Sequence, residues 1–204
     1  MSEDLPRSVS DRAIGHYLSA LAAPEPTPGG GSASGIVGAL GSALGEMALS
    51  LTDIDSSDHA DELRDAERKL ASLRERFIEL AREDEKVYQG YRNAADLPKR
   101  DDEEKSIRRV AMQDALKKAA GVPMAMCEAS VELNEALGPV QAHGNPHLRS
   151  DARVGGAFAR ACFQASRDMV EANLASIKDA EWVDEVTAHL DELAKRLDEP
   201  SVPA

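Results

Sequence analysis

The sequence is poor in aromatic residues and in cysteine. Phe, Trp and Tyr make up only 3 % of its 204 residues, whereas the hydrophobic fraction is 42 % and consists mainly of Ala, Leu and Val. A sandwich or a barrel needs β-branched and aromatic strand residues, so this composition favours closely packed helices. Cys127 and Cys162 lack metal-ligand spacing and are too few for a disulfide framework. We therefore interpret them as buried, reduced thiols.

Positive charge is also scarce. The chain has 24 Lys and Arg against 37 Asp and Glu, which gives a formal net charge of −13. Because such a surface repels nucleic acid and anionic lipid, we expect neither nucleic acid nor a membrane as a partner. An anionic small molecule remains compatible, since a few local cations can reverse the potential inside a cleft. The acidic surface would also suit a protein working at high salt, a hypothesis that activity measured against KCl concentration would test.

No secretory signal and no convincing membrane span are apparent. Residues 1–12 lack a basic start followed by an apolar run. The longest uncharged stretch, residues 26–45, is rich in Gly and Ser and ends at Glu46. We therefore expect a cytoplasmic protein. The length suits one domain and no segment resembles a linker, so we predict a single helical domain over residues 1–204.

Apolar residues recur at helical spacings through most of the chain, and no strand alternation is evident. The pattern predicts, in order, a short helix capped by Ser8 or Ser10, a small-residue helix over 34–52 and a long helix over 57–95. It then predicts a second long helix from Asp101 or Asp102 to Gly138-Pro139 with a kink at Pro123, a helix capped by Ser150 or Asp151, and a last helix over 182–197. The predicted fold class is all-α, a bundle of about six helices. Its glycine-rich helix should lie at the centre, where glycines let backbones approach closely.

The strongest local signal is PTPGGGS, residues 26–32. Gly29, Gly30 and Gly31 let the backbone approach a ligand, and the helix that follows Ser32 offers unpaired amides to an anion. The motif is not a Walker loop, because it lacks the terminal Gly-Lys-Ser/Thr. The alternative is a flexible turn that admits a small-residue helix to the core.

A second signal is a group of charged residues around the turn between the two long helices. Asp84 lies near the end of the first helix, Lys99 in the turn and Arg108 on the next helix. A helical hairpin with its turn near residue 99 brings the three toward one end of the molecule. Ordinary surface ion pairing is the alternative.

A third group of polar residues surrounds a predicted loop and comprises His143, Asn145 and Asp151. A Gly-Asn turn presents polar groups to a ligand, although a structural turn and a helix-capping Asp explain the same residues. His143 and His147 do not form a helical histidine pair, so we predict no metal site.

Taken in order, these segments resemble the cyclodeaminase/cyclohydrolase family, which includes the C-terminal domain of formiminotransferase-cyclodeaminase and free-standing methenyltetrahydrofolate cyclohydrolases. The resemblance covers roughly residues 10–180. It is carried by PTPGGGS at 26–32, MALSLT at 47–52, EDEKVY around Asp84, LPK at 97–99, EEKSIRR at 103–109 with Gln113 following, VP at 122–123, GN at 144–145, SD at 150–151 and Asn173. The chain departs from the family at Met169-Val170, where Asn-Val is frequent, and at Pro146-His147, where a second Asn is frequent.

The resemblance implies a homodimeric helical bundle that binds a tetrahydrofolate derivative as substrate near the glycine-rich turn and holds no permanent cofactor. The substrate-binding residues that it implies are Gly29, Gly30, Gly31, Ser32, Arg108, Asn145 and Asn173. The methenyl bridge of the substrate is cationic, so a carboxylate, Asp84 or Asp151, would stabilise it and take a proton from the attacking water. Lys99 or His143 would return a proton to the departing nitrogen, and Arg108 suits the glutamyl carboxylate.

Because the match uses nearly the whole chain, we expect no formiminotransferase domain within it. This favours a methenyltetrahydrofolate cyclohydrolase, which hydrolyses 5,10-methenyltetrahydrofolate to 10-formyltetrahydrofolate. The alternative is a formimidoyltetrahydrofolate cyclodeaminase that releases ammonia from 5-formiminotetrahydrofolate. A second alternative is a non-catalytic helical folate-binding or interaction module.

Overall fold

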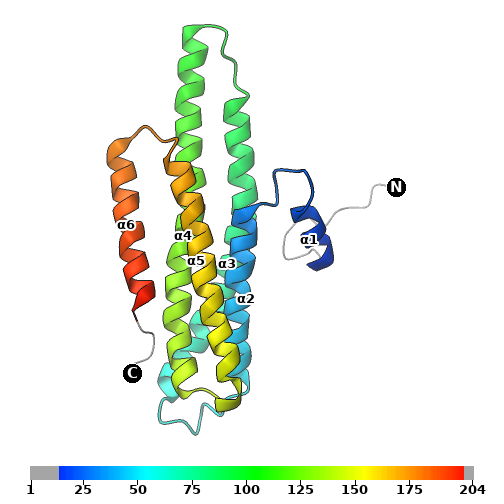
Figure 1. The fold of residues 1–204 in the computed structure, drawn as a ribbon, viewed down its shortest axis with the longest axis vertical. Helices are drawn as coiled ribbons and strands as arrows, with labels where there is room; N and C mark the ends of the chain where they lie inside the picture. Colours follow the sequence, from blue (N-terminus) through cyan, green and yellow to red (C-terminus); the bar gives the residue numbers. More distant parts are fainter. Residues whose placement is uncertain (1–13, 200–204) are drawn as a thin grey trace.

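The computed structural model describes residues 14–199, which form six α-helices, one short 3₁₀ turn and no strand. The elements are α1 (Ile14–Leu21), α2 (Gly30–Ser50), α3 (Ala60–Ala95), α4 (Asp102–His143), η2 (Pro146–Leu148), α5 (Arg149–Leu174) and α6 (Ala180–Asp198). Helices α2 to α5 run along one another in an elongated bundle, α6 lies against its side, and α1 stands apart near the start of α2 (Figure 1). The all-α prediction is confirmed, whereas the predicted caps Ser8 and Ser10 lie outside the described residues.

Helix α2 packs at the centre of the bundle because its glycines leave room for neighbouring side chains. A Cβ atom at Gly38 would lie 2.5 Å from the ring of Phe77, and one at Gly45 would lie 2.7 Å from Leu137. The predicted central position of this helix is therefore confirmed. On length and composition alone α2 could cross a membrane, but 56 % of the apolar window that meets this test is buried inside the bundle, as in the core helix of a globular protein.

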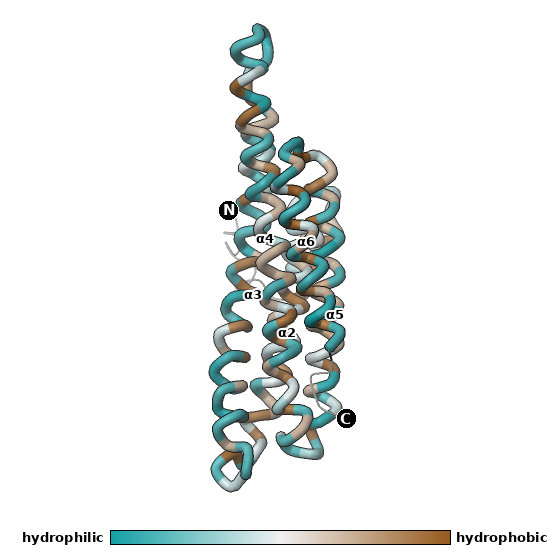
Figure 2. Tube along the Cα trace, turned by 90° about the vertical axis from the view of Figure 1, so that its left-hand side faces the viewer, coloured by the Kyte–Doolittle hydropathy of each residue, from teal (hydrophilic) through white to brown (hydrophobic). Residues whose placement is uncertain are grey.

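The hairpin of α3 and α4 extends well beyond the ends of the other helices (Figure 1). We call residues 92–111 the arm, and within it Ala94 is the only buried residue. Ile107 and Val110 are 57 % and 59 % exposed there, and Figure 2 shows a mostly hydrophilic tip. Arg108 links the two helices of the arm, because its Nε donates to the carbonyl oxygen of Ala95 at 2.9 Å.

Helix α4 is longer than the sequence predicted. Its start is as expected, since the Asp101 side chain accepts a hydrogen bond from the Glu104 amide at 2.8 Å. The predicted end at Gly138-Pro139 is wrong, because the helix includes both Pro123 and Pro139 and continues to His143. A proline inside a helix costs about 3 kcal/mol, and burial of the apolar residues around these two prolines offsets that cost. These neighbours are Val122, Met126, Leu137 and Val140.

The predicted cap of the next helix is also wrong. Helix α5 begins at Arg149, so Ser150 and Asp151 lie inside its first turn, and its N-cap residue Leu148 makes no side-chain cap. Asn145 provides the cap three residues earlier, because its side chain accepts from the His147 amide at 3.0 Å and begins η2. Pro146 then occupies the first position of that turn, where no amide proton is needed.

Candidate functional site

The glycine-rich turn borders a cleft between α2, α3, α4 and α5. The cavity holds about 360 Å³. Its lining residues are Pro26, Thr27, Gly29, Gly30, Asp84, Val87, Tyr88, Tyr91, Leu116, Ala119, Met169, Ala172, Asn173 and Ser176. Most of this wall is apolar, and Asp84 is the only ionisable carboxyl group among the lining residues. A flat ring system could therefore lie against the walls with its polar edge toward Asp84.

Asp84 is fixed against the start of α2. Its Oδ2 accepts a hydrogen bond from the Ser32 amide at 3.1 Å. A Cβ atom at Gly31 would collide with the same carboxylate, so only glycine leaves space for it. Burial raises the pKa of Asp84, the Ser32 hydrogen bond lowers it and the charge of Glu85 raises it, with a net increase above the ordinary value of 3.8. The carboxylate is thus held in place and binds a proton more readily than a solvated one.

The sequence reasoning missed the tyrosines of the site. The chain has three tyrosines. Tyr17 is buried on α1 and its hydroxyl lies 3.2 Å from Ser32 Oγ, which ties α1 to the start of α2. Tyr88 and Tyr91 lie on α3 and line the cleft. In a chain so poor in aromatic residues, two tyrosines within a few residues of Asp84 were a signal that could have identified this wall.

Asn173 and Met169 form the α5 side of the cleft. The Asn173 side-chain amide donates to the carbonyl oxygens of Met169 and Ala119, at 3.0 and 3.3 Å, and so links α5 to α4. Met169 Sδ lies 3.4 Å from the position of a Cβ atom at Gly30, so an apolar side chain faces the glycine turn. The structure therefore brings together Gly29, Gly30, Gly31, Ser32, Asp84 and Asn173 from the predicted site.

Lys99 and Arg108 lie in a separate groove on the arm side of the cleft. This basic groove holds about 450 Å³ and is lined by Lys99, Lys105, Arg108, Arg109, Met112, Gln113 and Lys178. Helix α3 continues from Asp84 to Ala95, about 16 Å at 1.5 Å per residue, before the turn that carries Lys99. The hairpin was thus predicted correctly, but its length places the two cations beside the cleft instead of within it. Their predicted roles stay predictions.

Three other predicted residues lie at the opposite end of the bundle. The Asn145 amide donates to Thr52 Oγ1 at 3.0 Å and its side chain donates to the Leu51 carbonyl at 2.7 Å, so Asn145 links two loops. His143 stacks on His59, with ring centroids 3.5 Å apart. Asp151 lies in the first turn of α5. Within one chain these residues do not join the Asp84 cleft, and their functional roles also stay predictions.

The histidine stack includes the one group of potential metal ligands found among residues 14–199. Donor atoms of His59, Glu62 and His143 lie within 4.8 Å of one another. The two imidazole rings are nearly parallel, with 8° between their planes. A ring nitrogen binds a metal in the plane of its ring, so one ion cannot be ligated by both rings unless one of them turns. As it stands, the group is a stacked pair with a hydrogen bond from His59 Nδ1 to Glu62, at 3.1 Å.

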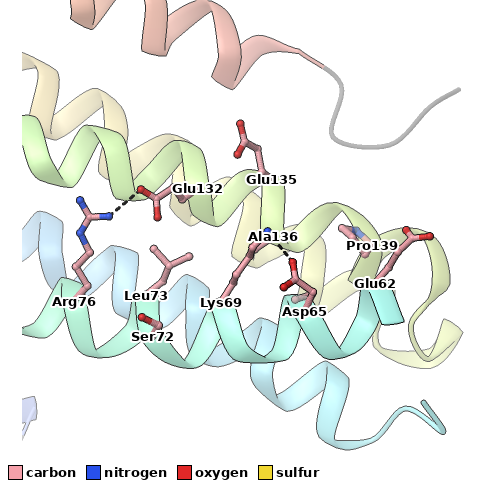
Figure 3. A pocket seen from close by; sticks show the side chains of 11 residues that line it. Glu62, Asp65, Lys69, Ser72, Leu73, Arg76, Glu132, Glu135, Ala136 and Pro139 are labelled. Atoms are coloured by element: carbon pink, nitrogen blue, oxygen red, sulfur yellow. Dashed lines mark hydrogen bonds and ion pairs between the residues drawn. The ribbon is translucent and has the colours of Figure 1, made fainter. Parts of the chain in front are cut away.

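A further cavity of about 270 Å³ lies between α3 and α4 on the body of the bundle. Figure 3 shows that its cations point toward neighbouring acids. Arg76 pairs with Glu132 at 2.9 Å, and Lys69 pairs with Asp65 at 2.7 Å. The positive charges of this cavity are neutralised within the chain, so it offers an anion little attraction.

Comparison with known proteins identifies the family. Residues 13–192 match the family model described as formiminotransferase-cyclodeaminase. A methenyltetrahydrofolate cyclohydrolase from Methylorubrum extorquens is 33 % identical over 180 residues, which cover 87 % of this chain and 86 % of that protein. A formimidoyltransferase-cyclodeaminase from Gallus gallus is 29 % identical over 85 % of this chain, although the match spans only 32 % of that longer protein. The chain belongs to the formiminotransferase-cyclodeaminase family.

A solved structure supports the same assignment. The crystal structure of a formiminotetrahydrofolate cyclodeaminase from Thermotoga maritima superposes with a TM-score of 0.84 and 26 % identity. The superposition covers 95 % of this chain and 93 % of that one. The predicted family and helical bundle are therefore confirmed along most of the chain, and the relatives named here are enzymes.

Proposed function

We propose that this protein is a methenyltetrahydrofolate cyclohydrolase that hydrolyses 5,10-methenyltetrahydrofolate to 10-formyltetrahydrofolate. The observation that carries the proposal is Asp84, a carboxylate that Ser32 fixes in place and the only ionisable carboxyl group lining a mostly apolar cleft. The cyclohydrolase from Methylorubrum extorquens, similar over most of both chains, supports this choice of reaction. The substrate is a folate, and we propose that no permanently bound cofactor takes part.

A single carboxylate can act as both the base and the acid in the hydrolysis. The bridge carbon of the substrate is a cationic amidinium, and a nearby negative charge stabilises it. As water adds to this carbon, Asp84 takes one proton from the water and a tetrahedral carbinolamine forms. The C–N5 bond then breaks, N5 receives a proton from Asp84, and the hydroxyl proton is released as the formyl oxygen forms. One proton is lost overall, and the raised pKa of Asp84 favours its alternation between base and acid.

Loss of methenyltetrahydrofolate absorbance tests the proposal. Wild-type protein should accelerate the loss above the buffer rate, and Asp84→Asn should reduce kcat about 10²-fold or more, the usual contribution of a positioned acid–base group. Asp114→Asn is the matched control, because Asp114 is an exposed carboxylate on α4 away from the cleft lining. Equal activity of Asp84→Asn and wild type would contradict the role of Asp84, and no acceleration by the wild type would contradict the reaction.

The same assay tests the prediction that Lys99 is the acid. Lys99 lies in the basic groove and not in the cleft, so a group that only attracts the substrate should affect KM and leave kcat unchanged. A large fall in kcat for Lys99→Met would instead support Lys99 as the proton donor.

The structural relative from Thermotoga maritima favours a second candidate function, the cyclodeaminase reaction. In that reaction ammonia leaves 5-formiminotetrahydrofolate as the ring closes to the methenyl form. Ammonia release on addition of this substrate, faster than methenyltetrahydrofolate hydrolysis, would reverse the order of the two candidates.

We also propose that the protein is a homodimer. Leu40 and Met47 on α2 and Leu51 at its C-cap form an exposed apolar stripe, with exposed fractions from 38 to 60 %, and Val154 on the adjacent α5 is 44 % exposed. Such a patch on a highly charged surface suits a second copy of the chain. Light scattering should give twice the chain mass, and Met47→Glu should shift it toward the monomer. The cytoplasmic location and the absence of nucleic-acid and membrane partners stay predictions from composition.

A further inference from the structure

Two histidines from distant parts of the chain meet at the end of the bundle opposite the Asp84 cleft. His59 is the N-cap residue of α3, and His143 is the last residue of α4. Their rings stack with centroids 3.5 Å apart, and Glu62 lies in the first turn of α3 beside them. Donor atoms of the three side chains lie within 4.8 Å of one another. The prediction of no metal site rested on the pairing of His143 with His147 and did not consider His59.

The backbone around both histidines is held in place by hydrogen bonds. The His59 amide donates to Ser57 Oγ at 3.1 Å. The loop that follows His143 is tied to the loop before α3, because the Asn145 amide donates to Thr52 Oγ1 at 3.0 Å. The two rings are therefore brought together by the fold itself, and a ligand between them has to order only side chains, which keeps the entropic cost of binding small.

Most of the ring nitrogens of this pair are available to a ligand. His59 Nδ1 lies 3.1 Å from Glu62 Oε1. The ring of His143 makes no hydrogen bond among residues 14–199. Stacking uses the faces of the rings, whereas a metal binds to the lone pair of a nitrogen in the ring plane. The contact between the rings therefore leaves their nitrogens free, and the Glu62 carboxylate lies close enough to act with them.

We propose that His59, Glu62 and His143 bind one Zn²⁺ ion, with a water molecule as the fourth ligand. Two imidazoles and a carboxylate are ligands that zinc favours, and bonds of about 2.0–2.2 Å place the donor atoms of a tetrahedral site about 3.4 Å apart. The donor atoms lie within 4.8 Å already, so no pair has to approach by more than about 1.4 Å. One ring must also turn out of the parallel stack. The His59 side chain is 43 % exposed and rotates easily about its Cβ–Cγ bond, so it has room to do so.

The charge around the three side chains favours a cation. The chain has a net charge of −13, and the loop before α3 carries Asp53, Asp55 and Asp58. Asp55 pairs with Arg64 at 2.6 Å. Asp53 and Asp58 form no ion pair within the described part of the chain. Their negative potential raises the local concentration of cations, and the imidazole nitrogens then select a transition metal such as zinc over Mg²⁺ or Ca²⁺.

The ion would join the start of α3 to the end of α4 and so stabilise this end of the bundle. Helix α3 separates His59 from Asp84 by 25 residues, which is about 37 Å of helix. The zinc is therefore structural and takes no part in the proposed hydrolysis, and this inference does not depend on that function. It also gives His143 the role of a metal ligand in place of the predicted role of proton donor.

Isothermal titration calorimetry of chelator-treated protein with ZnCl₂ tests the proposal. Wild-type protein should bind one ion per chain, and His143→Ala should weaken binding by more than the about 10–100-fold typical of an outer-shell residue. Glu62→Gln changes an exposed side chain, so it should weaken binding without disturbing the fold. At a free Zn²⁺ concentration of about 100 times Kd, the Tm of the wild type should rise by about 5–10 °C.

His189→Ala is the matched control. His189 is an exposed histidine on α6 that also contacts a carboxylate, Glu128, at 3.1 Å, so the variant removes the same kind of side chain elsewhere. It should retain the zinc affinity and the Tm shift of the wild type. Co²⁺ in place of Zn²⁺ should give the strong visible absorption of a four-coordinate ion in the wild type and in His189→Ala, and not in His143→Ala. Equal zinc affinity of the wild type and His143→Ala, or no binding by the wild type, would overturn the inference.

Discussion

The two parts of the α3–α4 hairpin are stabilised in different ways. In the body of the bundle Leu70, Phe77 and Leu133 are fully buried, and apolar packing stabilises both helices. In the arm Ala94 is the only buried residue, so backbone hydrogen bonds, the Arg108–Ala95 contact and exposed ion pairs must suffice. The comparison shows that stability resides in the body, which leaves the side chains of the arm available for binding.

Truncation of matched apolar side chains should show this difference most clearly. Leu133→Ala removes a fully buried side chain of α4 and should lower the free energy of unfolding by about 2–5 kcal/mol. Ile107→Ala on the same helix removes a side chain that is 57 % exposed and should change it by about 0.5 kcal/mol or less. Urea unfolding of both variants measures the contrast. Similar losses of unfolding free energy in the two variants would mean that Ile107 is buried against another protein surface in solution.

Adding a methyl group to glycines sharpens the comparison. Gly38→Ala would place its Cβ 2.5 Å from the Phe77 ring, and such overpacking should cost about 1–3 kcal/mol. Gly121→Ala is the matched control in α4, because its Cβ would meet nothing within 4 Å. It should stabilise the protein by about 0.5–1 kcal/mol through its better helix propensity. The Tm should therefore fall for Gly38→Ala and rise for Gly121→Ala. A rise in Tm for both variants would contradict the packing described for α2.

The smallest expected effect concerns Asp84 and pH. The folded protein raises the pKa of Asp84 above its ordinary value of 3.8, so the folded state binds this proton more tightly than the unfolded state. Stability due to this group is therefore lost as pH rises from about 4 through the raised pKa. At pH 7 Asp84→Asn should have a slightly higher Tm than wild type, and the difference should disappear at low pH.

The stability due to Asp84 should fall as pH rises, whereas the activity should increase. The carboxylate of Asp84 must be deprotonated to take a proton from water, so kcat/KM should rise with pH through the same raised pKa. This acidic limb should be absent from the residual activity of Asp84→Asn. A wild-type kcat/KM that falls as pH rises through the raised pKa of Asp84 would contradict the assignment of Asp84 as the base.

The helices and the glycine turn could be predicted because their signals are local. Apolar spacing predicted about six helices, and the family resemblance proposed Asp84 or Asp151 as the carboxylate of a site near the glycine-rich turn. The structure places Asp84 there. The end of α4 could not be predicted, because the helix includes Pro139 only by virtue of burial within the bundle. The start of α5 could not be predicted either, since Asn145, and not Ser150, caps the preceding turn.

The arrangement of the site depended on distances that sequence spacing does not give. Lys99 was expected near Asp84, but the length of α3 carries it into the adjoining groove. Asn145 was expected among the binding residues, yet its hydrogen bonds to Leu51 and Thr52 place it at the far end of the bundle. Because α2 to α5 alternate in direction, the α2–α3 and α4–α5 connections share one end of the bundle and the α3–α4 turn lies toward the other. The separation of the two groups therefore follows from the topology, which the sequence analysis did not apply to Asn145.

The close fit of α2 has a consequence for how this sequence can change over generations. A side chain at Gly31 meets the Asp84 carboxylate, one at Gly38 meets Phe77, and one at Gly45 meets Leu70 and Leu137. A larger side chain at any of these glycines therefore costs stability unless a smaller residue at the facing position accompanies it. At Gly38 and Gly45 such paired replacements can preserve the core. At Gly31 the facing residue is Asp84 itself. No compensating replacement can therefore make room for a side chain at this position and also keep the carboxylate.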